Sequence, residues 1–404
     1  MQEFPRYLYR APFVVSRPET VIEDGAVLTE HGLVVAVGKY SELKGADAKL
    51  EEYDGCVLTP ALVNCHAHLE LSNLAHLGAP QAQPEPGDIT GWISKLLAAR
   101  ASDHDGEACK DAAVFALAKL YGGGCRAVAD IGNLAASRLF GQGFKTEVYF
   151  FLEMLGLGPD SEKAALRALA EMDEDFCCTA HAPYSTSPGL IRALKKRAND
   201  FGRLFSIHAA ESAAEIEFLL NGTGPFRDFL EQRGVTLDSF IVPGKGAVAY
   251  LDSLGVLDDK TLCVHGVHVA EAEIDILAQR RATVCLCPGS NNFLGVGKAP
   301  VERYLAQGVP LTLGTDSMAS NPWFSLWHEM KSLRQDHPAV SPAQVLAMAT
   351  GNGAGYLGIA DRLGFIAPQS SSSFLAVRCP AVNVAEVLEH LTTIGGEVEL
   401  EWVE

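Results

Sequence analysis

The amino-acid sequence predicts an α/β fold, in which a (β/α)8 TIM-type barrel carries a small β-sandwich domain built from both termini. Two observations support this prediction. β-like runs alternate with helix-like segments through the middle of the chain, and short β-like runs separated by turns occupy both ends. The 404 residues suffice for a barrel and a second domain. We place the small domain at residues 1–57 and 361–404 and the barrel at residues 58–360.

Eight β-like runs define the predicted barrel. They cover residues 58–65, 125–130, 146–152, 176–181, 203–208, 261–265, 282–287 and 310–315. Amphipathic helical patterns between them cover residues 107–121, 161–171, 188–200, 213–220 and 271–280. Because eight such alternations are typical of this barrel, we expect the runs to form its parallel strands.

The long connection after the first run, residues 73–106, contains several prolines and a helix-like stretch at residues 89–97. A connection of this length on a compact barrel more often covers an active site than it forms a plain surface excursion. We therefore expect it to cover the site, with the surface excursion as the alternative.

The composition narrows the class of protein. The formal net charge of -18 argues against binding to nucleic acid or to an anionic membrane surface, because both need clustered Lys and Arg. No signal-peptide pattern and no run of about 18 apolar residues occurs, so a secreted or membrane-spanning product is disfavoured. The ten cysteines are scattered, many within apolar runs, which indicates a reducing compartment. We expect a cytoplasmic protein that acts on a small molecule, with a homodimer left open.

His66 and His68 lie two residues apart at the end of the first barrel run. In a strand, side chains at this spacing point to the same face, about 7 Å apart along the backbone. Two imidazoles on one rigid segment can begin a zinc or iron site. The pair alone is a weak signal, because His-x-His also occurs without a metal. Cys285 and Cys287 as thiolate ligands are a further alternative.

Further ionisable residues follow the later barrel runs. In this type of barrel the functional groups lie at the carboxyl ends of the strands. Six residues occupy these ends, and five of them are among only 12 histidines in the chain: His66, His68, His181, His208, His265 and Asp316. This placement predicts that they converge on one site.

The chemistry that these residues suggest is metal-dependent hydrolysis. The expected ligands of one divalent ion, zinc or else ferrous iron, are His66, His68, His208 and Asp316. Such an ion lowers the pKa of a water molecule from about 15.7 to about 7. Asp316 could also accept the proton of that water.

Glu211 and His265 are expected to act on the substrate beside this ion. Glu211 follows His208 by three residues, so it can lie beside the metal without binding it and transfer a proton to a ring nitrogen of the substrate. His265 would orient the water or stabilise developing charge. Each residue has a structural alternative: Glu211 as an acid in the first turn of a helix, His265 as a core histidine and Asp316 as a turn former.

Seven short segments carry a resemblance to a known family: Asn64–His68, His181–Ser185, Ser206–Glu211, Val264–His268, Ser290–Asn292, Leu313–Asp316 and Ala319–Asn321. They resemble the amidohydrolase superfamily, in its aminohydrolase and chlorohydrolase branch, over roughly residues 20–360. The resemblance implies the ligand set and the catalytic residues given above, with His181 as a substrate contact. The fourth run ends without a lysine, so the bridging carboxylated lysine of binuclear members is not expected.

Two features narrow the substrate that the resemblance implies. The segment Leu69–Ser72, followed by Gly91-Trp92-Ile93, resembles the aminodeoxyfutalosine deaminases of the alternative menaquinone route, which release ammonia from C6 of an adenine base. Glu70 and Trp92 are therefore expected to contact the substrate. The similar adenosylhomocysteine and methylthioadenosine deaminases have an acid just before this tryptophan, where the chain has Gly91. Glu70 would replace that acid or else face a neighbouring loop.

One segment departs from the resemblance. Relatives usually have a Gly-Lys-x-Ala-Asp stretch near the C-terminus, where this chain has residues 367–373 with four consecutive serines. Because this region belongs to the small domain, the departure weakens the expectation of a sandwich and leaves the chemistry unaffected.

Three functions from different classes stay open. The first is a metal-dependent deaminase of a purine nucleoside. The second is a hydrolase of the same fold that acts on another ring, such as guanine, a cyclic amide or a chlorinated triazine. The third is a catalytically silent scaffold, which would normally have lost a ligand or the acid, and this chain has kept them all.

Overall fold

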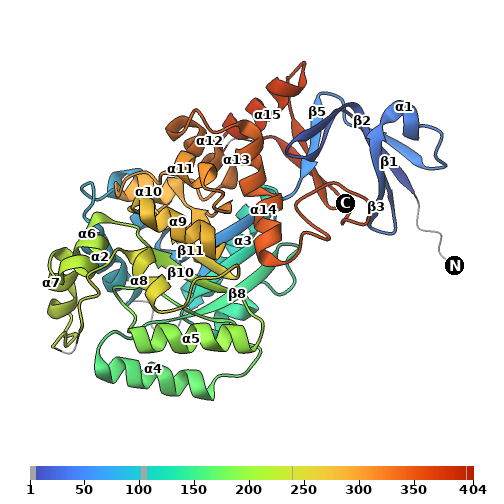
Figure 1. The fold of residues 1–404 in the computed structure, drawn as a ribbon. Coiled ribbons are helices and arrows are strands. Elements are labelled where there is room, and N and C mark those ends of the chain that lie inside the picture. The colour runs from blue at the N-terminus through green and yellow to red at the C-terminus, as the bar shows by residue number, and fades with distance from the viewer. Residues whose placement is uncertain (1–5, 102–106, 239, 397) are drawn as a thin grey trace.

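The structure is a computed structural model that describes residues 6–101, 107–238, 240–396 and 398–404. A barrel of parallel strands surrounded by helices forms most of the molecule, and a sheet built from both ends of the chain lies at one side of it (Figure 1). The predicted fold class, an α/β barrel with a small β domain from both termini, is confirmed.

Eight strands of the described residues form the barrel. They are β6 (Leu62–Ala67), β7 (Cys125–Gly132), β8 (Glu147–Met154), β9 (Cys178–Ala180), β10 (Phe205–Ala209), β11 (Thr261–His265), β12 (Thr283–Leu286) and β13 (Leu311–Leu313). Strands β6 to β9 pair in order and in parallel, as do β10 to β13. Every predicted run overlaps one of these strands.

Backbone hydrogen bonds at two functional positions join the two halves of the barrel. The amide of His208 on β10 donates to the carbonyl of His181, which follows β9, at 2.9 Å. On the other side, the amides of Thr315 and Asp316 both donate to the carbonyl of His66 at 3.0 Å. The closure therefore fixes the backbones that carry the candidate ligands.

Helices cover the outside of the barrel. They are α3 (Glu107–Gly122), α4 (Pro159–Glu171), α5 (Pro188–Asp200), α6 (Ala213–Asn221), α7 (Pro225–Gln232), α8 (Ala247–Ser253), α9 (Glu271–Arg280), α10 (Pro288–Leu294), α11 (Val301–Ala306), α12 (Leu326–Asp336), α13 (Pro342–Ala349) and α14 (Gly351–Leu357). The five helices predicted between the runs are confirmed, with both ends within two residues.

Helix α5 illustrates how the sequence forms these elements. The Ser187 hydroxyl accepts the amide of Leu190 at 3.1 Å, and Pro188 occupies the first turn, where its missing amide costs nothing. The helix buries the face formed by Leu190, Ile191, Leu194 and Ala198. Strands β10 and β11 are buried at every residue, because helices cover one face and the barrel interior covers the other.

Within the described part of the chain, seven strands form the terminal sheet. They are β1 (Tyr7–Arg17), β2 (Thr20–Glu30), β3 (Leu33–Lys39), β4 (Lys49–Glu52), β5 (Cys56–Pro60), β14 (Phe374–Arg378) and β15 (Leu400–Val403). Strand β14 pairs with β5, which joins the two ends of the chain in one sheet. The run predicted at residues 58–65 is divided, since its first residues belong to β5 and the rest to β6.

Residues 367–373 extend the terminal sheet despite their unusual sequence. The amide of Gln369 donates to the carbonyl of Val34 at 2.8 Å, and the amide of Val34 donates to the carbonyl of Ser370 at 2.9 Å. The segment thus lies along β3 through backbone hydrogen bonds, which do not depend on its side chains. Helix α15 (Val384–Thr393) then packs on α12 and α13 of the barrel.

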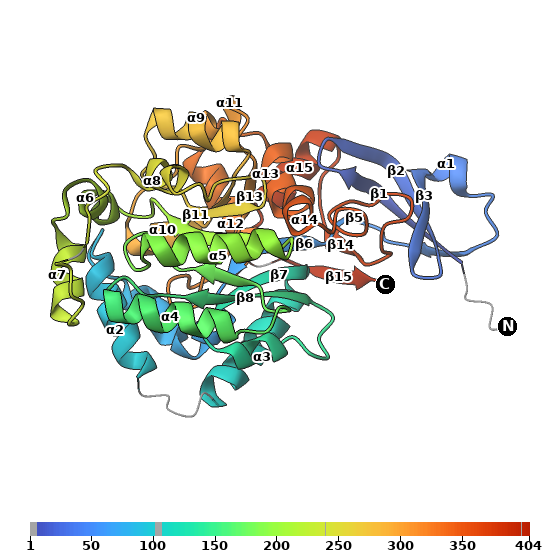
Figure 2. The same cartoon turned by 60° about the horizontal axis from the view of Figure 1, so that its bottom comes forward.

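The connection after β6 forms short 3-10 helices, η1 (Leu69–Gly78) and η2 (Pro80–Ala82), and helix α2 (Ile89–Arg100). Asp88 caps α2 by accepting the amide of Gly91 at 3.0 Å. Residues 102–106 of the connection lie outside the described part. Helices α2 and α7 lie at the end of the barrel opposite the terminal sheet (Figure 2). No helix among the described residues is long and apolar enough to cross a membrane.

Candidate active site

The residues predicted at the strand ends meet at the carboxyl end of the barrel. The Nε2 atom of His208 lies 3.3 Å from the Nε2 atoms of both His66 and His68. The Asp316 Oδ1 atom lies 3.6 Å from His66 Nε2 and 3.5 Å from His68 Nε2. The four predicted ligands thus direct one atom each toward a common point.

The tautomers of two histidines show that a cation fits this point. The Nδ1 atom of His68 lies 3.0 Å from the carbonyl of Ile131, and that of His208 lies 2.9 Å from the carbonyl of His181. A carbonyl only accepts, so both Nδ1 atoms carry the proton and both Nε2 atoms present lone pairs. Two lone pairs 3.3 Å apart cannot form a hydrogen bond with each other, whereas a cation between them can bind both.

Hydrogen bonds orient Asp316 as a further ligand for the cation. Its Oδ2 atom accepts hydrogen bonds from the hydroxyls of Ser290 at 2.6 Å and Ser320 at 2.9 Å, which leaves Oδ1 to face the histidines. The hydrogen bond to His66 and the neighbouring imidazoles hold the pKa of Asp316 well below its usual range, although burial alone would raise it. The carboxylate is therefore charged and available as a ligand.

Left-handed backbone conformations direct several of these residues. His265 has a φ of 74° and Asp316 a φ of 56°, and Ala210 has a φ of 56° just after β10. Non-glycine residues rarely adopt this region, and each such residue costs of order 1–2 kcal/mol. Their position directly after β10, at the end of β11 and after β13 indicates that the chain accepts strain to direct the strand ends inward.

His265 lies within reach of the same point. Its Nδ1 atom is 2.9 Å from the Asn291 Oδ1 atom, and its ligand atom falls within 4.8 Å of those of His66 and His208. Burial lowers the pKa of His265 to about 4, so its imidazole is neutral near pH 7. The metal site therefore includes His265 beside the four predicted ligands. The cation-binding groups among the described residues contain no cysteine, which argues against Cys285 and Cys287 as ligands.

Glu211 is the acid of the site. Its Oε1 atom lies 3.6 Å from the His265 Nε2 atom. Burial, followed by the negative charges of Asp316 and Glu215, raises the pKa of Glu211 well above its usual range. Glu215 fixes the adjoining backbone, because its carboxylate accepts the amides of Ala210 at 3.0 Å and Glu211 at 2.8 Å. A carboxyl whose pKa is raised in this way holds its proton more tightly and is suited to donate it to a substrate.

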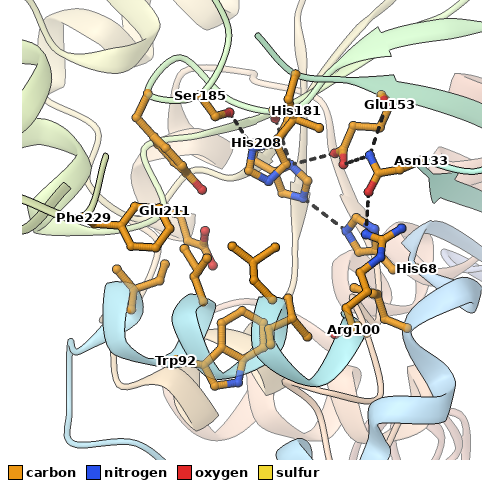
Figure 3. A pocket seen from close by; sticks show the side chains of 18 of the residues that line it. His68, Trp92, Arg100, Asn133, Glu153, His181, Ser185, His208, Glu211 and Phe229 are labelled. Atoms are coloured by element: carbon orange, nitrogen blue, oxygen red, sulfur yellow. Dashed lines mark hydrogen bonds and ion pairs between the residues drawn. The ribbon is translucent and has the colours of Figure 1, made fainter. Parts of the chain in front are cut away.

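A cavity of about 390 Å³ opens beside these residues. Its polar part is lined by His68, His181, His208, Glu211, His265 and Asp316. Its apolar part is lined by Ile93, Leu96, Leu97, Leu155, Leu157, Phe229 and Leu230. The connection at residues 73–106 contributes α2 to this wall, and α7 supplies Phe229 beside it (Figure 3).

His181 and Trp92, both predicted substrate contacts, line the cavity. The His181 Nδ1 atom lies 2.6 Å from the Ser185 hydroxyl, and burial lowers the pKa of His181 to about 4. The indole N–H of Trp92 donates to the carbonyl of Ala319 at 3.3 Å, which leaves the aromatic ring to contact a ligand. Their roles as substrate contacts stay predictions.

Glu70 also lines the cavity, but its carboxylate is already engaged. Its Oε1 atom accepts from Arg100 Nη2 at 2.5 Å and from the Asn133 amide at 2.9 Å. Its Oε2 atom accepts from the Leu134 amide at 3.2 Å and the Ser137 hydroxyl at 3.1 Å. Four hydrogen bonds use the acceptor positions of a carboxylate, so Glu70 faces the neighbouring loop, which was the alternative prediction.

Three polar cavity residues without a predicted role form one hydrogen-bond network: Arg100, Asn133 and Glu153. The Asn133 side chain links the other two, since its Oδ1 atom accepts from Arg100 Nη1 at 2.7 Å and its Nδ2 atom donates to Glu153 Oε2 at 3.0 Å. A carboxylate directly after the predicted run at 146–152 was the available signal for Glu153, by the rule that identified the other residues.

Comparison with known proteins identifies the family. A match to the amidohydrolase family covers residues 57–397, which is most of the chain. The chain therefore belongs to the amidohydrolase family, and it is an enzyme with a His/Asp metal site.

Individual relatives cover nearly the whole chain. It is 27% identical to the 5-methylthioadenosine/S-adenosylhomocysteine deaminase of Nitratidesulfovibrio vulgaris (strain DP4), over 97% of this chain and 91% of the relative. The solved structure of Helicobacter pylori aminofutalosine deaminase with methylthio-coformycin has a TM-score of 0.82 and 25% identity, over 97% of both chains. A Xanthomonas campestris adenosine deaminase with bound zinc has a TM-score of 0.78 and 24% identity, over 97% of this chain and 90% of that chain.

Proposed function

We propose that this chain is a metal-dependent deaminase that releases ammonia from C6 of an adenine nucleoside. The observation that carries the proposal is the pairing of a buried Glu211, whose pKa is raised, with the histidine cluster of His66, His68 and His208 at one cavity. A hydrolytic deaminase needs both an acid for a ring nitrogen and activated water.

The reaction balances with these residues. Water adds to C6, N1 of the ring takes a proton, and the C6–N6 bond breaks so that ammonia leaves and a C6 carbonyl forms. Glu211 donates its proton to N1, and the charged Asp316 accepts one from water. Asp316 then passes that proton to the leaving amine, and Glu211 recovers a proton from the C6 hydroxyl as the carbonyl forms. A divalent ion, when held by His66, His68, His208 and Asp316, would lower the pKa of a bound water. His265, neutral and held by Asn291, orients the water or stabilises charge at C6.

The first candidate substrate is 6-amino-6-deoxyfutalosine, which would place the enzyme in menaquinone biosynthesis. The likeness to Helicobacter pylori aminofutalosine deaminase supports this choice. The apolar part of the cavity supports it as well, because leucines of α2 and of residues 155–157 and Phe229 of α7 suit an apolar group carried on the sugar. Zinc is the first candidate metal and iron the second, since both accept imidazole and carboxylate ligands.

Methylthioadenosine and adenosylhomocysteine are the second candidates, supported by the 27% identity to a deaminase of both. Guanine, another aminated ring or a chlorinated triazine would require the same metal and acid with a different pocket. A cytoplasmic location and a homodimer stay predictions.

A substrate panel tests the proposal. Zinc-loaded protein should release ammonia from at least one adenine nucleoside, with the highest kcat/KM for 6-amino-6-deoxyfutalosine. Guanine and atrazine serve as controls for the alternatives. Turnover of atrazine or guanine without ammonia release from any adenine nucleoside would overturn the proposal.

A further inference from the structure

The carboxylates in the cavity wall have different amounts of free acceptor capacity. Among the described residues that line the cavity, four carry carboxylates: Glu70, Glu153, Glu211 and Asp316. Glu70 is saturated by four internal hydrogen bonds, and Glu211 and Asp316 face the reacting centre. Glu153 is left as a wall carboxylate without a role in the proposed reaction, and its carboxylate lies within 4.8 Å of ring nitrogens of His181 and His208.

The Glu153 carboxylate is buried, and only one of its two oxygens accepts a hydrogen bond. Its side chain is 5% exposed. The Oε2 atom accepts from Asn133 Nδ2 at 3.0 Å, whereas the Oε1 atom has no hydrogen-bond partner. The His208 Nδ1 atom lies 3.6 Å from Oε1, but it already donates to the carbonyl of His181 at 2.9 Å. Leaving a buried acceptor without a hydrogen bond costs free energy. A hydrogen-bond donor on a bound ligand would remove this cost at Oε1.

A network of hydrogen bonds holds Glu153 in place. The Asn133 Nδ2 atom donates to the Glu153 carbonyl at 3.1 Å as well as to its carboxylate, and the Asn133 Oδ1 atom accepts from Arg100 on α2. The network runs from α2 to the wall beside His208 and His181 (Figure 3). Because Glu153 cannot turn away without breaking these bonds, its free oxygen is preorganised for binding.

We infer that the free Oε1 atom of Glu153 accepts a hydrogen bond from a sugar hydroxyl of the nucleoside, which makes Glu153 a specificity-determining residue. This inference rests on the proposed function. The exocyclic amine of the adenine ring must lie at the reacting centre beside Glu211 and Asp316. The remaining hydrogen-bond donors of the nucleoside are therefore its sugar hydroxyls, and Glu153 is the acceptor available to them. Helix α2 places no carboxylate in the cavity that could serve them instead, since its lining residues are apolar apart from Trp92 and Arg100.

The competing explanation is that Glu153 orients His208 as a metal ligand, because the two side chains lie close together. A carboxylate in that role would change metal affinity and would affect every substrate equally. A sugar-binding role would change only the substrates that carry the hydroxyl. The two roles therefore differ in what they do to metal content and to substrate preference.

The test compares adenosine with 2′-deoxyadenosine and 3′-deoxyadenosine on zinc-loaded wild type, Glu153→Met and Glu153→Gln. Met has a similar length and only a weakly accepting sulfur, and Gln keeps hydrogen-bonding capacity without the charge. Glu171→Gln, which alters an exposed carboxylate at the end of α4, is the matched control. Ammonia release gives kcat/KM, and metal analysis gives the zinc content of each protein.

Wild type should prefer adenosine over at least one deoxynucleoside by about tenfold to a hundredfold, the range for leaving one buried acceptor without its hydrogen bond. Glu153→Met should reduce this preference to within about threefold with unchanged zinc content, because the loss of kcat/KM falls mainly on the substrate that carries the hydroxyl. Glu153→Gln should be intermediate and Glu171→Gln should equal wild type.

Several results would overturn the inference. The first is equal kcat/KM for adenosine and both deoxynucleosides in wild type, a result that needs no folded variant. The second is an equal loss of kcat/KM for all substrates in Glu153→Met. The third is a loss of zinc from Glu153→Met while its preference for adenosine stays intact. Failure of wild type to release ammonia from any adenine nucleoside would overturn the proposed function together with this inference. Ammonia release without a hydroxyl preference would overturn this inference alone.

Discussion

The Nε2 atoms of His68 and His208 lie 3.3 Å apart, and both present lone pairs because a backbone carbonyl accepts the Nδ1 proton of each ring. Burial lowers the pKa of His68 to about 3 and that of His208 well below its usual range, so protonation near pH 7 does not relieve this arrangement. A bound cation does relieve it. The two carbonyls that fix the tautomers thus prepare the site for a metal.

Zinc should therefore stabilise the folded protein. At free zinc a thousandfold above its dissociation constant, the free energy of unfolding should rise by about 4 kcal/mol over that of chelator-treated protein. Urea unfolding of both forms measures the difference. His76→Ala, at an exposed position, should respond like wild type, while His66→Ala should lose the response. Equal responses of the two variants would refute the ligand assignment.

The two hydroxyls on Asp316 should matter to metal affinity. Ser290→Ala removes the 2.6 Å hydrogen bond to Asp316 Oδ2, so the carboxylate is less well oriented and zinc affinity should fall about tenfold to a hundredfold. Competition with a chromophoric chelator measures the change. Ser341→Ala, which removes an exposed hydroxyl at the start of α13, is the control and should leave affinity unchanged. An unaltered affinity in Ser290→Ala would contradict this role.

Glu70 should act through the loop that it holds. Glu70→Gln weakens the hydrogen bonds to Arg100 and to the Asn133 amide, so the free energy of unfolding should fall by about 2 kcal/mol and KM should rise. Zinc content should stay constant, because Glu70 does not face the ligands. Glu85→Gln, on an exposed acid of the same connection, should match wild type. Loss of zinc in Glu70→Gln would instead place this residue at the metal.

Glu215 should make stability depend on pH. Burial raises its pKa from 4.5 to about 7, so the folded state binds this proton more tightly than the unfolded state does. The resulting stabilisation is complete below pH 4.5 and is lost as pH rises through 7, with a total of about 3 kcal/mol. The stability of wild type minus that of Glu215→Gln should therefore be lower at pH 8 than at pH 5 by urea unfolding. A difference that rises with pH would contradict the assignment.

The barrel could be predicted from sequence because its strands and helices follow simple periodic patterns. Strands such as β10 and β11 are short apolar runs, and the histidines follow them at positions where a barrel places its functional groups. The same rule identified Asp316 after β13. The division of the run at residues 58–65 between β5 and β6 was missed, because both pieces are apolar and only pairing separates them.

The side-chain network of the cavity wall could not be predicted. Arg100, Asn133 and Glu153 come from separate segments, and their hydrogen bonds depend on how α2 docks against the end of β8. The left-handed backbone conformation of His265 could not be predicted from sequence either, because tertiary contacts impose it and local preference does not. The two possible roles of Glu70 could be named from sequence, but only the hydrogen bonds show that it faces the loop.

The central claim is that one metal site with one neighbouring acid performs the deamination, and the most direct test is the metal content and ammonia release of two variants. Glu211→Gln should keep one zinc per chain and lose turnover by at least about a hundredfold, because only the proton donor is gone. His208→Ala should lose both zinc and turnover. Retention of zinc and ammonia release by both variants would contradict the account.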